Sequence, residues 1–147
     1  MVQKIPYDGD KKIMTKILIV EDSPFFRQLL KETLQSRFPS VEVMEAIDGQ
    51  EALKKIDASL PDLVFMDIKL PGESGLELTR RIKARYPNIR ILILTSYDFP
   101  EYREAASQYG ANHFLSKGTT TKDQILNLVQ SILSKKKDPP ASNLLEK

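Results

Sequence analysis

Apolar residues gather in five short runs along the chain, and three of these runs are nearly continuous rather than alternating with polar residues. Such runs of Ile, Leu and Val are typical of parallel strands that are buried on both faces of a sheet. We therefore predict strands over residues 16–21, 41–46, 62–67, 89–95 and 113–116. Helices must then cover both faces of this sheet.

Between and after these runs, apolar residues recur at intervals of three and four, the period of an amphipathic helix. The first helix is predicted to begin directly after Asp22, because Ser23 can cap it and Pro24 suits its first position. Gly110 is predicted to stop the fourth helix. Strands and helices thus alternate five times, which predicts an α/β fold with a doubly wound, five-stranded parallel sheet and five helices.

With 147 residues, 41% of them hydrophobic and 29% charged, the chain has the composition of one compact globular domain. No apolar stretch approaches the ~20 residues that a membrane span needs, and the N-terminus lacks the apolar middle of a signal peptide. We therefore expect a cytoplasmic protein without membrane contact. The absence of cysteine excludes disulfides, thiolate metal sites and cysteine nucleophiles.

The net charge of +2 is carried by the ends of the chain, because residues 135–147 contribute +2 and residues 1–13 contribute +1. The slightly acidic body lacks the basic face of a nucleic-acid-binding domain, so we expect no direct DNA binding by this chain. We predict an N-terminal extension over residues 1–13 and one domain over residues 14–137. Residues 138–147, with two consecutive prolines, are predicted to be a linker or a disordered tail.

Polar side chains follow four of the five predicted strands at their carboxyl ends. Glu21 and Asp22 close the first run, Asp67 the third, Thr95 the fourth and Lys117 the fifth. In a doubly wound sheet these ends form one edge, where ligands bind. Each residue alone has an ordinary explanation as a turn, a cap or a solvated strand end, but their common placement predicts a shared site.

Three carboxylates at one edge need a cation, because two such charges about 4 Å apart repel by about 4 kcal/mol at an effective dielectric constant of roughly 20. Oxygen ligands suit Mg²⁺, which we predict as the cofactor. Asp67 can then act as a nucleophile toward a phosphoryl group. Lys117 can offer its ammonium, and Thr95 its hydroxyl, to phosphoryl oxygens.

In these segments the chain resembles the receiver domain of two-component response regulators, over about residues 16–135. The matching segments are residues 17–23 (ILIVEDS), 63–72 (LVFMDIKLPG), 91–96 (ILILTS) and 110–117 (GANHFLSK). The resemblance implies a flavodoxin-like sheet with strand order 2-1-3-4-5. It also implies a phosphorylation-activated switch in signal transduction that is not an enzyme, apart from catalysing its own phosphorylation and dephosphorylation.

By the same resemblance, Asp67 receives the phosphoryl group from a sensor histidine kinase or a phosphotransfer protein. Asp22 and Asp67 would bind Mg²⁺ directly, Glu21 would bind it through water, and the backbone carbonyl of Lys69 would supply another ligand.

Thr95 and Phe114 resemble the pair that couples phosphorylation to a change at the surface. A dianionic group would draw Thr95 inward and let the ring of Phe114 turn in, which biases a two-state surface. The face formed by the fourth helix, fifth strand and fifth helix is the expected homodimer or partner surface.

The chain departs from many receivers at Gly118, where they carry a proline after the lysine. Receivers joined to LuxR-type DNA-binding domains often lack this proline too, so the chain also resembles the receiver half of a LuxR-type transcription regulator. Lys69 and Tyr97 occupy variable positions near the phosphate and are expected to tune its lifetime.

Two other functions remain open at this point. A degenerate receiver-like interaction module would act without phosphorylation, but it should have lost acidic or lysine residues that this chain keeps. A Mg²⁺-dependent aspartyl-phosphate phosphatase of the haloacid dehalogenase type should carry a second Asp two residues after the nucleophile, where this chain has Lys69.

Overall fold

The computed structural model describes residues 7–8, 11–12 and 15–135, and its centre is a parallel sheet of five strands. The strand order β4-β3-β5-β6-β7 corresponds to 2-1-3-4-5 within this sheet, so the implied order is confirmed. The strands are β3 (Lys16–Val20), β4 (Glu42–Ala46), β5 (Leu63–Met66), β6 (Arg90–Thr95) and β7 (His113–Ser116). Each lies within one or two residues of its predicted range, the usual uncertainty at the ends of elements.

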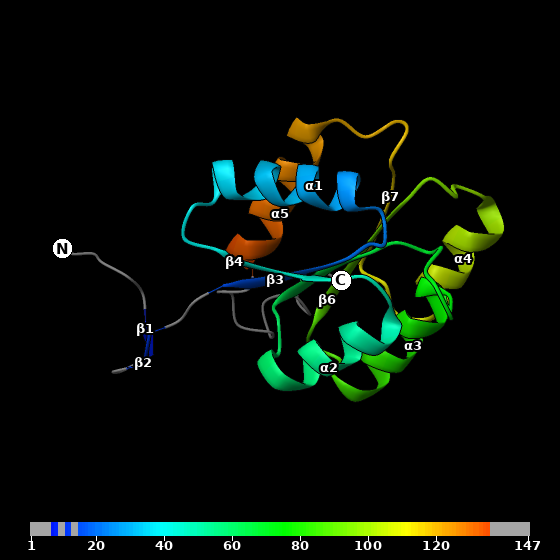
Figure 1. Ribbon diagram of the computed structural model, residues 1–147, viewed down its shortest axis with the longest axis horizontal. Coiled ribbons are helices and arrows are strands. Elements are labelled where there is room, and N and C mark those ends of the chain that lie inside the picture. The colour runs from blue at the N-terminus through cyan, green and yellow to red at the C-terminus, as the bar shows by residue number, and fades with distance from the viewer. Residues whose placement is uncertain (1–6, 9–10, 13–14, 136–147) are drawn as a thin grey trace, which may run out of the picture.

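Five helices connect and follow these strands, as predicted. They are α1 (Pro24–Arg37), α2 (Gly49–Ser59), α3 (Gly75–Arg85), α4 (Pro100–Gln108) and α5 (Lys122–Lys135). Figure 1 shows α1 and α5 together on one side of the sheet and α2 and α3 on the other. Helix α3 contacts both α2 and α4, so these three helices form one layer.

The two helical layers bury alternate residues of the same strands. Ile19 of β3 belongs to a cluster with Leu34 of α1, whereas the next residue, Val20, belongs to a second cluster with Ile56 of α2. All of these side chains are at most 1% exposed. Every residue of β5 is buried, which explains why its sequence is a continuous apolar run.

Side-chain caps set where the helices begin. The hydroxyl of Ser23 accepts the backbone N–H of Phe26 (3.3 Å) and starts α1, as predicted. Asp48 caps α2 and Ser74 caps α3 in the same way. Gly110 adopts a φ of 99° just after α4, a conformation that glycine tolerates and that ends the helix as predicted.

A short antiparallel pair precedes the sheet and was not predicted. Its strands are β1 (Tyr7–Asp8) and β2 (Lys11–Lys12). The predicted tail over residues 138–147 lies outside the described residues, so the division into extension, domain and tail stays a prediction. In the parts of the chain that the structure describes, no helix has both the length and the hydropathy needed to span a membrane.

Leu34→Ala should destabilise the fold by about 2–5 kcal/mol, because it removes a fully buried side chain and leaves a cavity between α1 and the sheet. Gln35→Ala, at the adjacent exposed position, should change the unfolding free energy by less than about 0.5 kcal/mol. Urea denaturation measures both, and equal midpoints for the two variants would contradict the assigned packing of α1.

Candidate functional site

The site lies at the carboxyl edge of the sheet, where three residues leave their strands with their backbones still tied to neighbouring strands. The N–H of Glu21 donates to a carbonyl of β4 (3.0 Å), and that of Asp67 donates to a carbonyl of β3 (3.1 Å). The N–H of Lys117 donates to the carbonyl of Thr95 (2.9 Å). These backbone hydrogen bonds therefore fix the positions of the Cα atoms from which the three side chains extend.

Three carboxylates meet at this edge. Oxygen atoms of Glu21, Asp22 and Asp67 all lie within 4.8 Å of one another. Glu21 and Asp67 are 3% and 7% exposed, whereas Asp22 is open to solvent. Within the described residues, the carboxylate of Asp22 has no hydrogen-bond or ion-pair partner, so it can serve a ligand. A set of hard oxygen donors with an open side suits Mg²⁺.

The ammonium of Lys117 lies against two of these carboxylates. Its Nζ donates to Oε1 of Glu21 (2.8 Å) and to Oδ2 of Asp67 (3.3 Å). One ammonium against three ionised carboxylates leaves two negative charges in the site. A divalent cation would neutralise that remainder.

Burial raises the pKa of the Glu21 carboxyl above its ordinary value. The hydrogen bonds from Lys117 and from the N–H of Ser23 act in the opposite direction, and the nearby charge of Asp67 reinforces the effect of burial. The ionised form of Glu21 is therefore disfavoured by its surroundings, and a cation at the site would offset this penalty.

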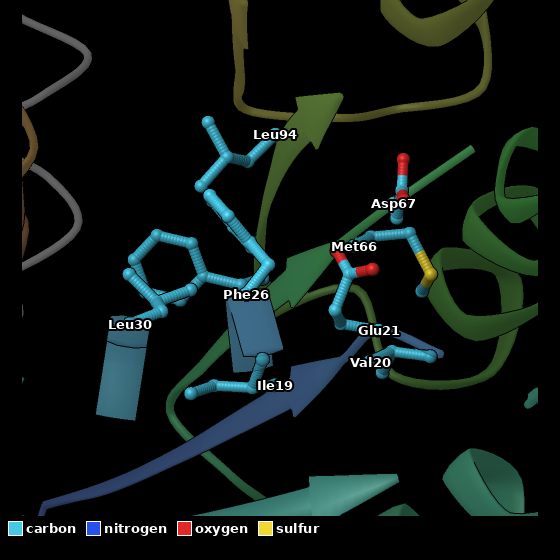
Figure 2. Close-up of a pocket in the computed structure, with 9 residues that line it drawn as sticks. Ile19, Val20, Glu21, Phe26, Leu30, Met66, Asp67 and Leu94 are labelled. Atoms are coloured by element: carbon cyan, nitrogen blue, oxygen red, sulfur yellow. The ribbon is translucent and has the colours of Figure 1, made fainter. Parts of the chain in front are cut away.

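A small, shallow pocket opens beside these carboxylates. Figure 2 shows the carboxylates of Glu21 and Asp67 close together beyond the ends of their strands, with Leu30 and Leu94 on the other flank of the pocket. The ring of Phe26 also lines this pocket. The site is therefore acidic on one side and apolar on the other.

Thr95 and Phe114 lie on the face of the sheet that is turned away from α1 and α5. Phe114 is paired in register with Ile93, two residues before Thr95, so both side chains point to the layer of α2, α3 and α4. Thr95 is fully buried, and its hydroxyl oxygen accepts the N–H of Tyr97 (3.2 Å). Phe114 is half-buried, and the guanidinium carbon of Arg103 lies 4.7 Å from its ring centroid.

Lys69 lies exposed in the loop after Asp67. Its Nζ is 5.2 Å from the ring centroid of Tyr97, and its backbone pairs with Ser74. The predicted role of the Lys69 carbonyl as a metal ligand stays a prediction. The structure thus brings Glu21, Asp22, Asp67 and Lys117 together, and places Lys69 against Tyr97 instead of in a contact with the carboxylates.

Two supporting residues were not singled out by the sequence. Arg27 donates to the backbone carbonyl of Glu21 (2.8 Å) and to the carboxylate of Glu45 on β4 (2.9 Å), so it anchors the acidic loop. Because Arg27 lies in the first turn of α1, shortly after Glu21 and Asp22, the sequence could have indicated that it contacts this acidic segment. Phe26 was read only as an apolar helix position, because its contact with Lys117 joins residues far apart in the sequence.

Gly75 supports Asp67 through its missing side chain. A Cβ placed there would lie 1.9 Å from the backbone carbonyl oxygen of Asp67, which no real structure tolerates. The N–H of Gly75 also donates to the carbonyl of Ile68 (2.8 Å). The start of α3 therefore packs directly on the peptide that carries the candidate acceptor.

The sequence model of the response regulator receiver domain family matches residues 17–130. Transcriptional activator protein ExaE of Pseudomonas putida is 38% identical over 118 residues, which cover 80% of this chain and 55% of that protein. Sporulation initiation phosphotransferase F of Bacillus subtilis is 36% identical over 100 residues, which cover 67% of this chain and 79% of that protein.

Among solved structures, a two-component response regulator of the LuxR family from Aurantimonas sp. SI85-9A1 matches with a TM-score of 0.75 at 30% identity. The match covers 83% of this chain and 86% of that one. The chain spans about half the length of several curated relatives. Its matches cover 55%, 54% and 43% of the lengths of three transcriptional regulators.

Gly75→Ala should destabilise the protein by about 1–3 kcal/mol or more, because α3 must move away from the Asp67 peptide. Gly118→Ala is the matched control, since its Cβ would meet nothing closer than the Ser116 hydroxyl at 3.8 Å. Thermal or urea unfolding compares the two variants. A Gly75→Ala protein as stable as the wild type would show that α3 does not press on Asp67.

Proposed function

The chain belongs to the response regulator receiver domain family, and from this premise we propose that Asp67 accepts a phosphoryl group from a phosphohistidine of a sensor histidine kinase or a phosphotransfer protein. The observation that carries this proposal is the contact of one ammonium with two buried carboxylates at the sheet edge. Lys117 is held where it can meet the oxygens of a group on Asp67.

We propose Mg²⁺ as the cofactor, with Asp22 and Asp67 as direct ligands, Glu21 bound through water, and the carbonyl of Lys69 as a further ligand. The three clustered carboxylates support this assignment by their oxygen donors and their unbalanced charge. When bound, the ion would supply neutralisation of the negative charge on the phosphoryl oxygens.

The two oxygens of Asp67 have different surroundings, which supports a defined direction of attack. Oδ1 accepts the N–H of Ile68 at 2.7 Å, while Oδ2 faces Lys117 at 3.3 Å. We propose that Oδ2 attacks phosphorus while the bond from phosphorus to the histidine nitrogen breaks, so that the imidazole leaves. Lys117 then transfers its hydrogen bond from Oδ2 to a phosphoryl oxygen.

Thr95 and Phe114 are the proposed switch. The Thr95 oxygen already accepts the N–H of Tyr97, so its own proton is available to a phosphoryl oxygen. Movement of Thr95 would change the space beside Phe114 on the same face of the sheet. Because Arg103 covers that ring and bonds Asp98 at 2.6 Å, we propose that the change reaches α4 and the α4-β7-α5 surface for a partner or a homodimer.

Receiver domains are generally not enzymes in their own right, and we propose that this chain catalyses only its own phosphorylation and dephosphorylation. We further propose that residues 14–137 form the receiver unit, flanked by an extension and a linker. The partial coverage of longer transcriptional regulators supports an output role in transcription through a further domain, with no DNA contact from this unit.

Acetyl phosphate with Mg²⁺ should add the mass of one phosphoryl group to the wild-type protein and none to Asp67→Ala, because Asp67 supplies the nucleophile. Intact-protein mass spectrometry measures this. Glu42→Gln, at the opposite edge of the sheet, should be modified like the wild type.

An unmodified wild-type protein in that experiment would favour the phosphorylation-independent interaction module. Rapid multiple-turnover hydrolysis of general phosphomonoesters would instead favour the phosphatase.

Mg²⁺ alone should raise the melting temperature of the wild type, since a ligand that binds only the folded state stabilises it. Asp22→Asn should weaken the Mg²⁺ affinity by more than the roughly 10-fold that the loss of an outer-shell partner causes. A Mg²⁺ titration followed by thermal unfolding gives both affinities, and Glu42→Gln serves as the control. The same titration curve for Asp22→Asn and wild type would remove Asp22 from the ligand set.

A further inference from the structure

Phe26 in the first turn of α1 presents its ring to the ammonium of Lys117. Nζ lies 4.1 Å from the ring centroid, well inside the ~6 Å range of a cation–π interaction. The side chain of Lys117 is 16% exposed, so this contact is largely shielded from water. The ring and the carboxylates of Glu21 and Asp67 border the same small pocket.

The same short segment of chain positions both the ring and one of the carboxylates. Ser23 accepts the N–H of Phe26 through its hydroxyl (3.3 Å) and donates its own N–H to Oε2 of Glu21 (3.0 Å). Glu21 Oε1 is then the atom left to contact Lys117. The ammonium is therefore held between a ring and the carboxylate of Glu21, whose relative positions are set by one helix cap.

These contacts differ in what happens to them during the proposed reaction. The carboxylates of Glu21 and Asp67 change their electrostatic pull on Lys117 when a cation binds or when Asp67 is modified. The ring of Phe26 carries no net charge and no exchangeable proton, so its attraction for the ammonium does not depend on the charge of the bound groups. Lysine needs such a support because its four-carbon side chain is flexible.

We propose that Phe26 is a positioning residue, whose ring keeps the ammonium of Lys117 directed at the acceptor carboxylate by a cation–π contact. This inference rests on the proposed function of Asp67. The free energy of a cation–π contact, from an exposed site to a partly desolvated one, corresponds to a factor of about 3 to 30 in an equilibrium constant or a rate. Phosphorylation by a small donor should slow by this factor when the ring is lost.

The first test compares Phe26→Leu with the wild type in the initial rate of phosphorylation by acetyl phosphate at saturating Mg²⁺. Leucine keeps an apolar side chain but removes the π face. Phe25→Leu is the matched control, because the neighbouring Phe25 is 77% exposed and does not line the pocket that Phe26 lines. We expect a roughly 3- to 30-fold slower rate for Phe26→Leu and an unchanged rate for Phe25→Leu.

The second test separates the electrostatic effect of the ring from its shape. Replacing Phe26 by 4-fluoro- and 3,4,5-trifluorophenylalanine weakens the negative face of the ring stepwise while nearly keeping its volume. The rate should fall stepwise in this series. These variants also keep the test decisive if Phe26→Leu fails to fold.

The third readout needs no reaction. In the protein without donor or metal, the Cε protons of Lys117 should show an upfield ring-current shift by NMR, which Phe26→Leu loses and Phe25→Leu keeps.

The outcomes distinguish the inference from the function on which it rests. A wild-type protein that acetyl phosphate cannot modify overturns the proposed function and the catalytic consequence of the inference with it. Normal modification of the wild type and of every Phe26 variant overturns the inference alone. A slow Phe26→Leu with a flat fluorinated series, or an unchanged Lys117 shift in Phe26→Leu, also overturns it, because the ring would then act only by packing.

Discussion

The ammonium of Lys117 lies between two buried carboxylates, and the arrangement of the sheet edge depends on this contact. Glu21 and Asp67 are both largely buried, and without a shared counter-charge their repulsion would add to the cost of burial. The contact is nevertheless incomplete, because Asp22 brings a third carboxylate and leaves the cluster negative. A site that is held together but undercompensated is suited to take up a cation and then an anionic group.

Because side chains alternate along a strand, the residues at this sheet edge fall into two groups, one on each face of the sheet. Glu21, Asp67 and Lys117 each follow a residue of the α1 and α5 layer by two positions, so they share that face. Thr95 and Phe114 belong to the opposite face, toward α3 and α4. The side chains of the proposed acceptor and of the proposed switch therefore start from opposite faces of the sheet, and the N–H of Lys117 meets the Thr95 carbonyl where the two faces join at the sheet edge.

Local periodicity predicted the strands, the helices and the cap at Ser23, because each depends on residues close together in the sequence. The gathering of Asp67 and Lys117 was predictable once the strands were taken as parallel, whereas the strand order came from the family resemblance. The β1–β2 pair has only two residues in each strand, too few for any period to show. The contact of Phe26 with Lys117 could not be predicted from the sequence either, because it depends on how α1 packs against the sheet.

The backbone around Asp67, the proposed acceptor, is closely packed. Arg27 ties the carbonyl of Glu21 to β4, and the start of α3 at Gly75 presses on the carbonyl of Asp67. By contrast, the residues that follow β6, from Ser96 to Pro100, are all exposed. There the buried hydroxyl of Thr95 bonds only to the N–H of Tyr97 among the described residues, a contact that a phosphoryl oxygen can rearrange. These supports hold the backbone of Asp67, so we propose that the loop before α4 is the segment that responds when Asp67 is phosphorylated.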